Sequence, residues 1–190
     1  MQTIRKPISH RLNTPDPHRM TDKCQSFVPS QDNTRALRDA FGCFGTGVTV
    51  VTATTSDGPL GMTANSFSSI SLDPALVLWA PAKNSKRHDA FISAREFCIH
   101  VLSADQLDMA QHFASEGKDF SPFASDTGPT GAPRLLGCLA EFHCCTHAVH
   151  PAGDHSLVLG RVQHVVHTIS DKPGLVFAKG QFGRFSSATP

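Results

Sequence analysis

Apolar residues recur at intervals of three and four in three short stretches of the chain, and this spacing predicts three helices. The first begins at the capping pair Asn33–Thr34 and ends near Gly47. The second begins at Ser85, and the third follows Ser103 and Gln106, which have the spacing of a capping box. The apolar residues expected to face inward are Leu37, Phe41 and Phe44, then Ala90, Phe91 and Ala94, then Leu107, Ala110 and Phe113.

Other stretches are rich in β-branched residues or alternate between apolar and polar residues, which is typical of strands. Phe97, Ile99 and Val101, for example, share one face of such a strand. Residues 118–133 are rich in Gly, Pro and Ser and predict a long loop. Because strands outnumber helices without strict alternation, the expected class is mainly β with short helices, a β-barrel rather than a parallel sheet. The predicted strands lie near residues 48–53, 75–80, 97–102, 139–147, 157–168 and 175–179.

Residues 1–33 differ from the rest of the chain, since they contain Pro7, Pro15, Pro17 and Pro29 and show no sustained periodicity. This composition predicts a flexible N-terminal arm, or a strap over a partner. A chain of 190 residues suits one domain of ordinary size. We therefore expect a single folded domain over residues 34–190.

Charge and cysteine content narrow the possible function classes. The 17 Lys and Arg residues against 16 Asp and Glu residues provide no basic field, so no nucleic-acid partner is expected. The longest apolar runs, such as residues 75–82, are too short to span a bilayer, so no membrane association is expected. Six cysteines without a Cys-x-x-Cys pair, and an N-terminus without an apolar signal region, indicate reduced thiols in a cytoplasmic protein. An organellar transit peptide stays open, because no acidic residue precedes Asp16.

His143, Cys145 and His147 are the residues most like a metal site, because they share one face of a predicted strand. Zinc needs three or four converging ligands, whereas ligands at alternate positions of one strand diverge along its length. We therefore expect no metal here and expect the cysteines to pack as small apolar side chains. Nothing in the sequence around any cysteine singles out a nucleophile.

Three segments carry residue types that suit ligand binding. Residues 61–71 offer hydroxyls, an amide and close backbone without an ionisable group, which suits a neutral, planar ligand edge; the alternative is a polar loop. Residues 83–87 combine three cations with a predicted helix start, which suits a phosphate; the alternative is a solvated basic turn. In Gly153-Asp154-His155, the glycine permits a tight turn and the carboxylate can orient the imidazole; the alternative is a surface turn.

The sequences Phe-Gly-Thr-Gly-Val-Thr-Val-Val-Thr at 44–52, Gly-Met-Thr-Ala-Asn-Ser at 61–66 and Gly-Asp-His at 153–155 together resemble the short-chain flavin reductases. These are the reductase components of two-component flavin-dependent monooxygenases. The resemblance runs from about residue 34 to residue 185. This sequence departs from the family pattern at two positions. Ala75 stands where the family has a second proline after Asp73-Pro74, and the aromatic residue of the tail is Phe182, because the chain has no tyrosine.

The resemblance implies an FMN-binding split β-barrel that forms a homodimer and transfers a hydride from NADH or NADPH to FMN or FAD. Reduced flavin would then serve a partner monooxygenase, or be used after free diffusion. His155 is the implied catalytic residue and would position the nicotinamide together with Gly153, Asp154 and Phe182. The alternatives are a flavin-binding split barrel without turnover, or a reductase of another acceptor such as a cobalt corrinoid or a ferric chelate. The implied flavin-binding residues are Gly61, Met62, Thr63, Asn65, Ser66, Pro81, Ala82, Ser85, Lys86, Arg87, His112 and Phe113.

Overall fold

The computed structural model describes residues 24–186. Residues 24–33 contain a short 3-10 helix, η1 (Gln31–Asn33), in which the Ser30 N–H donates to Asn33 Oδ1 at 2.9 Å. The rest of the expected N-terminal arm lies outside the described residues. The division of the chain at residue 33 therefore stays a prediction.

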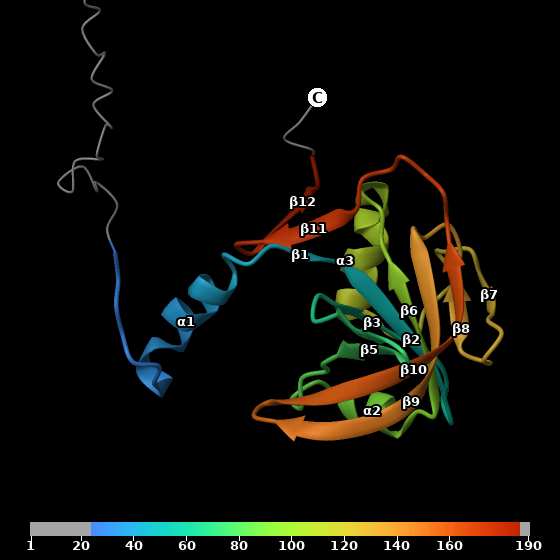
Figure 1. Cartoon of the computed structure of the whole chain (residues 1–190), viewed down its shortest axis with the longest axis horizontal. Helices are drawn as coiled ribbons and strands as arrows, with labels where there is room; N and C mark the ends of the chain where they lie inside the picture. The colour runs from blue at the N-terminus through green and yellow to red at the C-terminus, as the bar shows by residue number, and fades with distance from the viewer. Residues whose placement is uncertain (1–23, 187–190) are drawn as a thin grey trace, which may run out of the picture. The chain divides into compact units, whose positions relative to one another are not determined.

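The described residues form twelve strands, and seven of these build one antiparallel sheet (Figure 1). A mainly β fold with antiparallel sheets is thus confirmed. In spatial order the sheet contains β3 (Gly58–Ala64), β2 (Thr49–Thr55), β6 (Glu96–Val101), β9 (Ala140–Ala152), β10 (His155–His167), β5 (Ala75–Trp79) and β4 (Ser68–Leu72). Its longest pair, β9 and β10, is a single hairpin that turns at residues 153 and 154.

Two smaller antiparallel sheets correct the predictions from sequence. One contains β1 (Thr46–Gly47), β11 (Leu175–Ala178) and β12 (Gln181–Arg184), so Gly47 lies in a strand and does not end a helix. β12 was not predicted, because its short polar sequence forms a strand only where β11 offers an edge to pair with. The other sheet pairs β7 (Ser125–Thr127) with β8 (Pro133–Leu135), so the predicted loop 118–133 contains a strand.

The three predicted helices are present as α1 (Thr34–Phe41), α2 (His88–Ser93) and α3 (Leu107–Ser115). The capping box forms as predicted over η2 (Ala104–Gln106), with the Ser103 N–H donating to Gln106 Oε1 at 3.0 Å. α2 begins three residues later than predicted, because Ser85 Oγ accepts the Arg87 N–H and holds the preceding residues in turns. α1 buries no residue, and the predicted inward residues Phe41 and Phe44 are 70% and 77% exposed.

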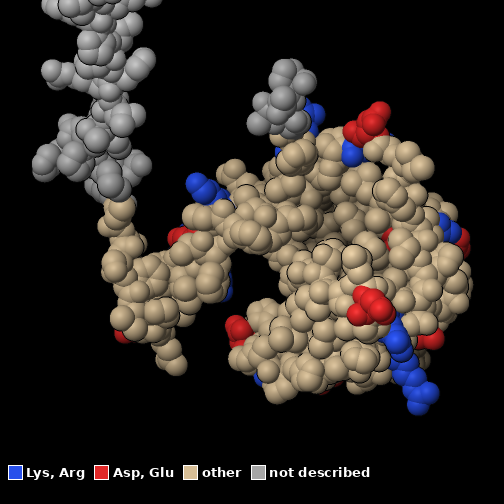
Figure 2. Space-filling model, viewed as in Figure 1, with Lys and Arg blue, Asp and Glu red and all other residues tan. Residues whose placement is uncertain are grey.

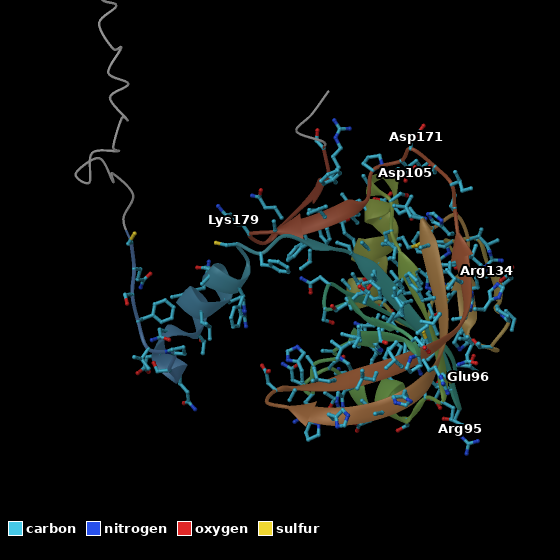
Figure 3. All side chains as sticks on the ribbon, viewed as in Figure 1. Arg95, Glu96, Asp105, Arg134, Asp171 and Lys179 are labelled. Atoms are coloured by element: carbon cyan, nitrogen blue, oxygen red, sulfur yellow. The ribbon has the colours of Figure 1, made fainter. Side chains whose placement is uncertain are left out.

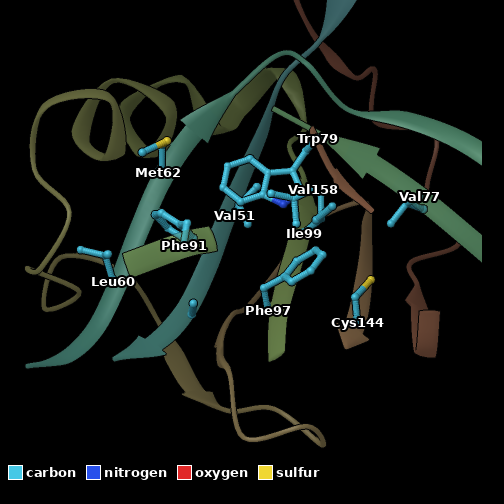
Figure 4. Packing of buried hydrophobic residues seen from close by; sticks show 11 residues of the cluster. Val51, Leu60, Met62, Val77, Trp79, Phe91, Phe97, Ile99, Cys144 and Val158 are labelled. Carbon is cyan, nitrogen blue, oxygen red and sulfur yellow. The ribbon is translucent and has the colours of Figure 1, made fainter. Parts of the chain in front are cut away.

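The core consists of two apolar clusters that use opposite faces of β2. Val51 packs into one cluster and Val50 into the other, as expected for consecutive strand residues. In the first cluster the rings of Trp79 and Phe91 meet edge to face, with centroids 5.1 Å apart (Figure 4). The second cluster lies under α3 and contains Phe113. Because both faces of the sheet are covered here, β2 and β6 are buried on both sides over most of their length.

Charged side chains lie in small, scattered groups on the face shown in Figure 2, and most of that face is uncharged. None of the helices within residues 24–186 has the length and hydropathy needed to cross a membrane.

Candidate functional site

The segment 61–66 is held against α3 by close packing and hydrogen bonds. The Gly61 N–H donates to the Gly117 carbonyl at 2.7 Å. A Cβ at Gly61 would lie 2.4 Å from the Phe113 ring, so only glycine allows this approach. Thr63 Oγ1 donates to the Ala110 carbonyl at 2.6 Å. β3 therefore reaches the site in a position that α3 fixes, with Met62 buried in the core.

Asn65 and Ser66 continue this segment beyond the end of β3. Ser66 Oγ accepts the Ala80 N–H at 2.9 Å and lies 3.3 Å from the Ala80 carbonyl. The segment is thereby joined to residues 80–87. The Asn65 side chain is exposed, so its amide is available to a ligand.

Residues 80–83 are joined in turn to the β9–β10 hairpin. The Ser156 N–H donates to the Pro81 carbonyl at 3.1 Å, and Ala82 pairs with His155 as an isolated bridge. The Lys83 N–H donates to the Asp154 carbonyl at 2.8 Å. These contacts bring the predicted flavin segment and the predicted nicotinamide turn into one continuous site.

The hairpin turn has the geometry that its sequence predicts. Gly153 has φ +59°, as the first position of a two-residue type II′ loop requires. Lys83 Nζ donates to the Gly153 carbonyl at 2.6 Å. Asp154 Oδ1 lies 2.8 Å from His155 Nδ1, and this hydrogen bond lowers the pKa of the Asp154 carboxyl. The carboxylate thus fixes the orientation of the His155 ring and leaves its Nε2 unconstrained by Asp154.

The Arg87 side chain has structural partners that the sequence did not reveal. Its guanidinium donates to the carbonyls of Gly61 at 2.9 Å, Phe113 at 2.8 Å and Ala114 at 2.8 Å. Partial burial lowers the pKa of Arg87, and the charge of Glu116 opposes this effect. Arg87 thus joins β3 to the C-terminal end of α3, and three of its five N–H groups are already used.

Lys86 is exposed beside Arg87, and the two residues line a pocket of about 470 Å³. Lys118, which the sequence did not single out, also lines the pocket, and its Nζ lies 3.4 Å from Asp57 Oδ2. The cations therefore face a cavity large enough for a phosphate. The remaining lining residues are Thr55, Leu60, Ser85, Ala90, Ser115, Glu116 and Gly117.

His112 and Phe182 have their contacts outside segment 61–66, residues 80–87 and the β9–β10 hairpin. His112 Nε2 lies 2.7 Å from the Asp119 carbonyl, and its ring meets the edge of Phe113. Phe182 lies on β12, where its ring contacts Phe177 with centroids 5.0 Å apart. Phe182 lines a separate pocket with Leu107. Within this one chain, the structure does not bring Phe182 to the site, because β12 belongs to the small three-stranded sheet.

His143, Cys145 and His147 do not converge. His143 is fully buried, with Nε2 3.3 Å from Glu141 Oε2, whereas His147 is exposed and Cys145 Sγ contacts the Arg161 carbonyl. Residues 24–186 contain no group of three potential ligands arranged to hold a metal ion.

A buried polar cluster surrounds His143 instead. Glu141 accepts a hydrogen bond from Arg134. Arg134 lies on β8 and is labelled in Figure 3. Nearby, the Leu135 N–H donates to His100 Nε2 at 3.0 Å, and His100 Nδ1 lies 3.0 Å from the Val50 carbonyl. Burial lowers the pKa of His100 to about 4, so this ring is neutral in the folded protein.

The cysteines divide by exposure. Burial raises the pKa of Cys138 and Cys144 to about 12 and also raises that of Cys98, so these thiols are inert. Cys24 and Cys43 are exposed.

Known proteins resemble this chain over most of its length. Residues 41–186 match the sequence model of the flavin reductase like domain. The FMN reductase (NADH) SmoA of Agrobacterium fabrum is 51% identical over 160 residues, which cover 84% of this chain and 91% of that protein. The reductase component of a flavin-dependent trigonelline monooxygenase from Acinetobacter baylyi is 43% identical over 83% of this chain. The chain spans only 51% of the length of that second relative.

A solved structure has the same architecture. The NADH:FAD oxidoreductase SgcE6 of Streptomyces globisporus, in complex with NAD and FAD fragments, superposes with a TM-score of 0.79 at 36% identity. The superposition covers 87% of this chain and 100% of that chain.

Proposed function

Because the chain belongs to the flavin reductase family, we propose that it transfers a hydride from NADH to FMN or FAD. The observation that carries the proposal is the junction of segment 61–66 with the turn 153–155. Residues 80–83 join the two through Ser66, Ser156 and His155. Hydride transfer requires the nicotinamide and flavin rings to lie face to face, so the segments that bind them must be held together.

The residues of the site fit a flavin. Its ring edge is neutral and planar, which matches the hydroxyl and amide groups of Thr63, Asn65 and Ser66. Its phosphate is anionic, which matches the exposed Lys86 at the mouth of the pocket. The nicotinamide and the flavin supply the hydride chemistry themselves. The task of this chain is therefore alignment: Asn65 orients one partner, and His155, held by Asp154, orients the other.

The proposal is tested by steady-state oxidation of NADH and of NADPH with FMN, FAD and riboflavin added in turn. We expect NADH oxidation that depends on added or copurified flavin. Flavin binding without NADH or NADPH oxidation would refute the reductase and favour the non-catalytic carrier. Turnover only with a corrinoid or a ferric chelate would favour the other acceptor class.

We further propose that the chain works as a cytoplasmic homodimer and supplies reduced flavin to a monooxygenase. The relative from Acinetobacter baylyi is the reductase component of such a system. The exposed Phe41 and Phe44 at the end of α1 provide an apolar surface that suits a second copy of the chain. A coupled assay with a monooxygenase and a light-scattering measurement of mass test the two parts separately.

A further inference from the structure

His88 forms a hydrogen-bonded link that the proposed chemistry has not used. Its ring is buried, with Nε2 3.0 Å from Ser156 Oγ and Nδ1 2.8 Å from Asp89 Oδ1. His88 is the first residue of α2, and Ser156 is the second residue of β10. Both ring nitrogens therefore have partners, and the ring joins two elements that are 68 residues apart in the chain.

The three side chains have the atom order of a hydrolytic triad, but the serine cannot act as a nucleophile. Ser156 is only 5% exposed, so its hydroxyl does not reach a substrate. The Asp89 side chain is 94% exposed, so the carboxylate end of the link is in solvent. The pair His88–Ser156 is therefore the buried, structural part of the arrangement.

Ser156 directly follows His155, and its own N–H is bonded to the Pro81 carbonyl. The imidazole thus holds the side chain of a residue whose backbone already joins the hairpin to residues 80–83. With both contacts made, the start of β10 is fixed relative to the segment 85–87 that precedes α2. A shift of His88 would be transmitted to the backbone of His155.

We propose that His88 is a positioning residue, which holds His155 in register with the flavin segment through its hydrogen bond to Ser156. The inference rests on the proposed reductase function. Thr63 and Ser66 anchor the flavin segment through other partners, Ala110 and Ala80. Loss of the His88 link should therefore slow hydride transfer and leave flavin affinity unchanged.

The test compares His88→Gln with His88→Asn. The glutamine amide reaches the position of Nε2 and can still bond Ser156, whereas the asparagine amide reaches only the position of Nδ1. In single-turnover stopped flow at saturating NADH, we expect His88→Asn to slow hydride transfer about tenfold or more. His88→Gln should stay close to wild type. The loss should appear in kcat, with the flavin dissociation constant unchanged.

Ser156→Ala keeps the test decisive if His88→Asn does not fold, because it removes the same hydrogen bond with a smaller change. It should reproduce the slow step, and the double variant should lose no more than either single variant. His100→Asn is the matched control, since His100 is also buried with two hydrogen bonds, but its partners Val50 and Leu135 are not predicted site residues. It should lower the thermal midpoint and leave the rate of hydride transfer unchanged.

A wild-type rate in both His88→Asn and Ser156→Ala would overturn the inference, and so would an equal loss in His88→Gln and His88→Asn. If the wild-type protein oxidised neither NADH nor NADPH, the proposed function would fail instead. The link would then be judged by amide exchange, which should accelerate at Ser156 and Lys83 in His88→Asn. Unchanged exchange would overturn it.

Discussion

Side chains of the segment 61–66 differ in how far the protein itself uses their hydrogen-bonding groups. Thr63 and Ser66 are bonded to the backbone of Ala110 and Ala80, so part of their capacity goes into holding the segment in place. The exposed Asn65 amide has both donors and an acceptor to offer a bound molecule. Recognition of the flavin edge should therefore depend most on Asn65.

Asn65→Ala should weaken FMN binding by about 1–3 kcal/mol, because a buried polar edge of the ligand would lose its partner. Fluorescence titration measures the dissociation constant. Ser69→Ala, at an exposed polar position on β4, is the control and should bind as wild type. Native affinity in Asn65→Ala would remove this residue from the flavin site.

His155→Ala should impair the use of NADH and spare flavin binding, because the two ligands are assigned to different segments. Losing a positioning contact should lower kcat/KM about 5- to 150-fold. Stopped-flow hydride transfer and NADH titration separate the rate from the affinity. Native NADH kinetics together with weaker flavin binding would show that the turn serves the flavin instead.

Among the elements, β3, α2 and α3 meet through one guanidinium. Arg87 stands just before α2 and donates to carbonyls of β3 and α3. A lysine would bring its donors from a single nitrogen and could not also supply the bond that the second guanidinium nitrogen makes to Ala114. The cation therefore has a structural role, and the neighbouring Lys86 is left to balance the charge of a ligand.

Riboflavin, which lacks the phosphate, should bind more weakly than FMN to the wild-type protein. Lys86→Ala should reduce the difference in affinity between FMN and riboflavin without changing the midpoint of thermal unfolding. Arg87→Ala should also lower the midpoint, because it leaves three carbonyls without this donor. Equal affinity of the wild-type protein for riboflavin and FMN would contradict the assignment of the phosphate to this pocket.

The contact between β6 and β8 makes stability depend on pH through His100. Its pKa is about 4 in the folded protein and about 6.5 in an unfolded chain. As the pH falls through this window, the unfolded state takes up the proton first, so the folded state loses on the order of 3 kcal/mol. Burial also lowers the pKa of the neighbouring His143, so this residue too makes the folded state less stable as the pH falls.

Urea unfolding at several pH values between 7.5 and 4.5 measures this effect. His100→Gln should be less stable at pH 7.5 and should show a shallower loss of stability on acidification. The same slope in the variant and the wild type would assign the pH dependence to other groups.

Local features of these elements were predictable from sequence, and long-range ones were not. The capping box of Ser103 and Gln106 lies within four residues, so its spacing alone reveals it. The run Lys-Asn-Ser-Lys-Arg predicted an anion site, but the carbonyls that Arg87 binds lie 26 and 27 residues away along the chain. In the same way, the sequence does not show why residue 61 must be glycine. The reason is the Phe113 ring, which the fold packs against it and which leaves no room for a Cβ.

For the molecule as a whole, the excess of strands over helices predicted a β-barrel rather than a parallel sheet, and the family resemblance implied the split barrel. The predicted site residues come from β3, the loop 80–87, α3 and the β9–β10 hairpin. Hydrogen bonds join segment 61–66 to residues 80–83 and these in turn to the hairpin. Phe182 is the exception, because a tail position was inferred without a local pattern. Six strands were missed, since their pairing partners rather than their own sequences decide their conformation. They are β1, β3, β4, β7, β8 and β12.

Exposed aromatic residues at the end of α1 predict association of two copies: Phe41 is its last residue, and Phe44 follows three residues later. Phe41→Ser combined with Phe44→Ser should shift a dimer toward monomers, because both rings are largely exposed in the single chain. Light scattering after size exclusion, over a dilution series, measures the change. Phe185→Ser, which alters another exposed ring, is the control. A wild-type protein that is monomeric at all concentrations would contradict the prediction.

The burial of the core thiols has a chemical consequence for a protein that releases reduced flavin. Reduced flavin in air reacts with dioxygen and gives hydrogen peroxide, which oxidises accessible thiolates. Cys98, Cys138 and Cys144 are shielded from it, since they are buried and stay protonated. Cys24 and Cys43 are exposed but lie outside the strands and helices, so oxidation there leaves the core intact. Cys145 is half-buried on β9 and is the one thiol of the described strands that is not fully buried. The fold thereby restricts peroxide to Cys24, Cys43 and Cys145.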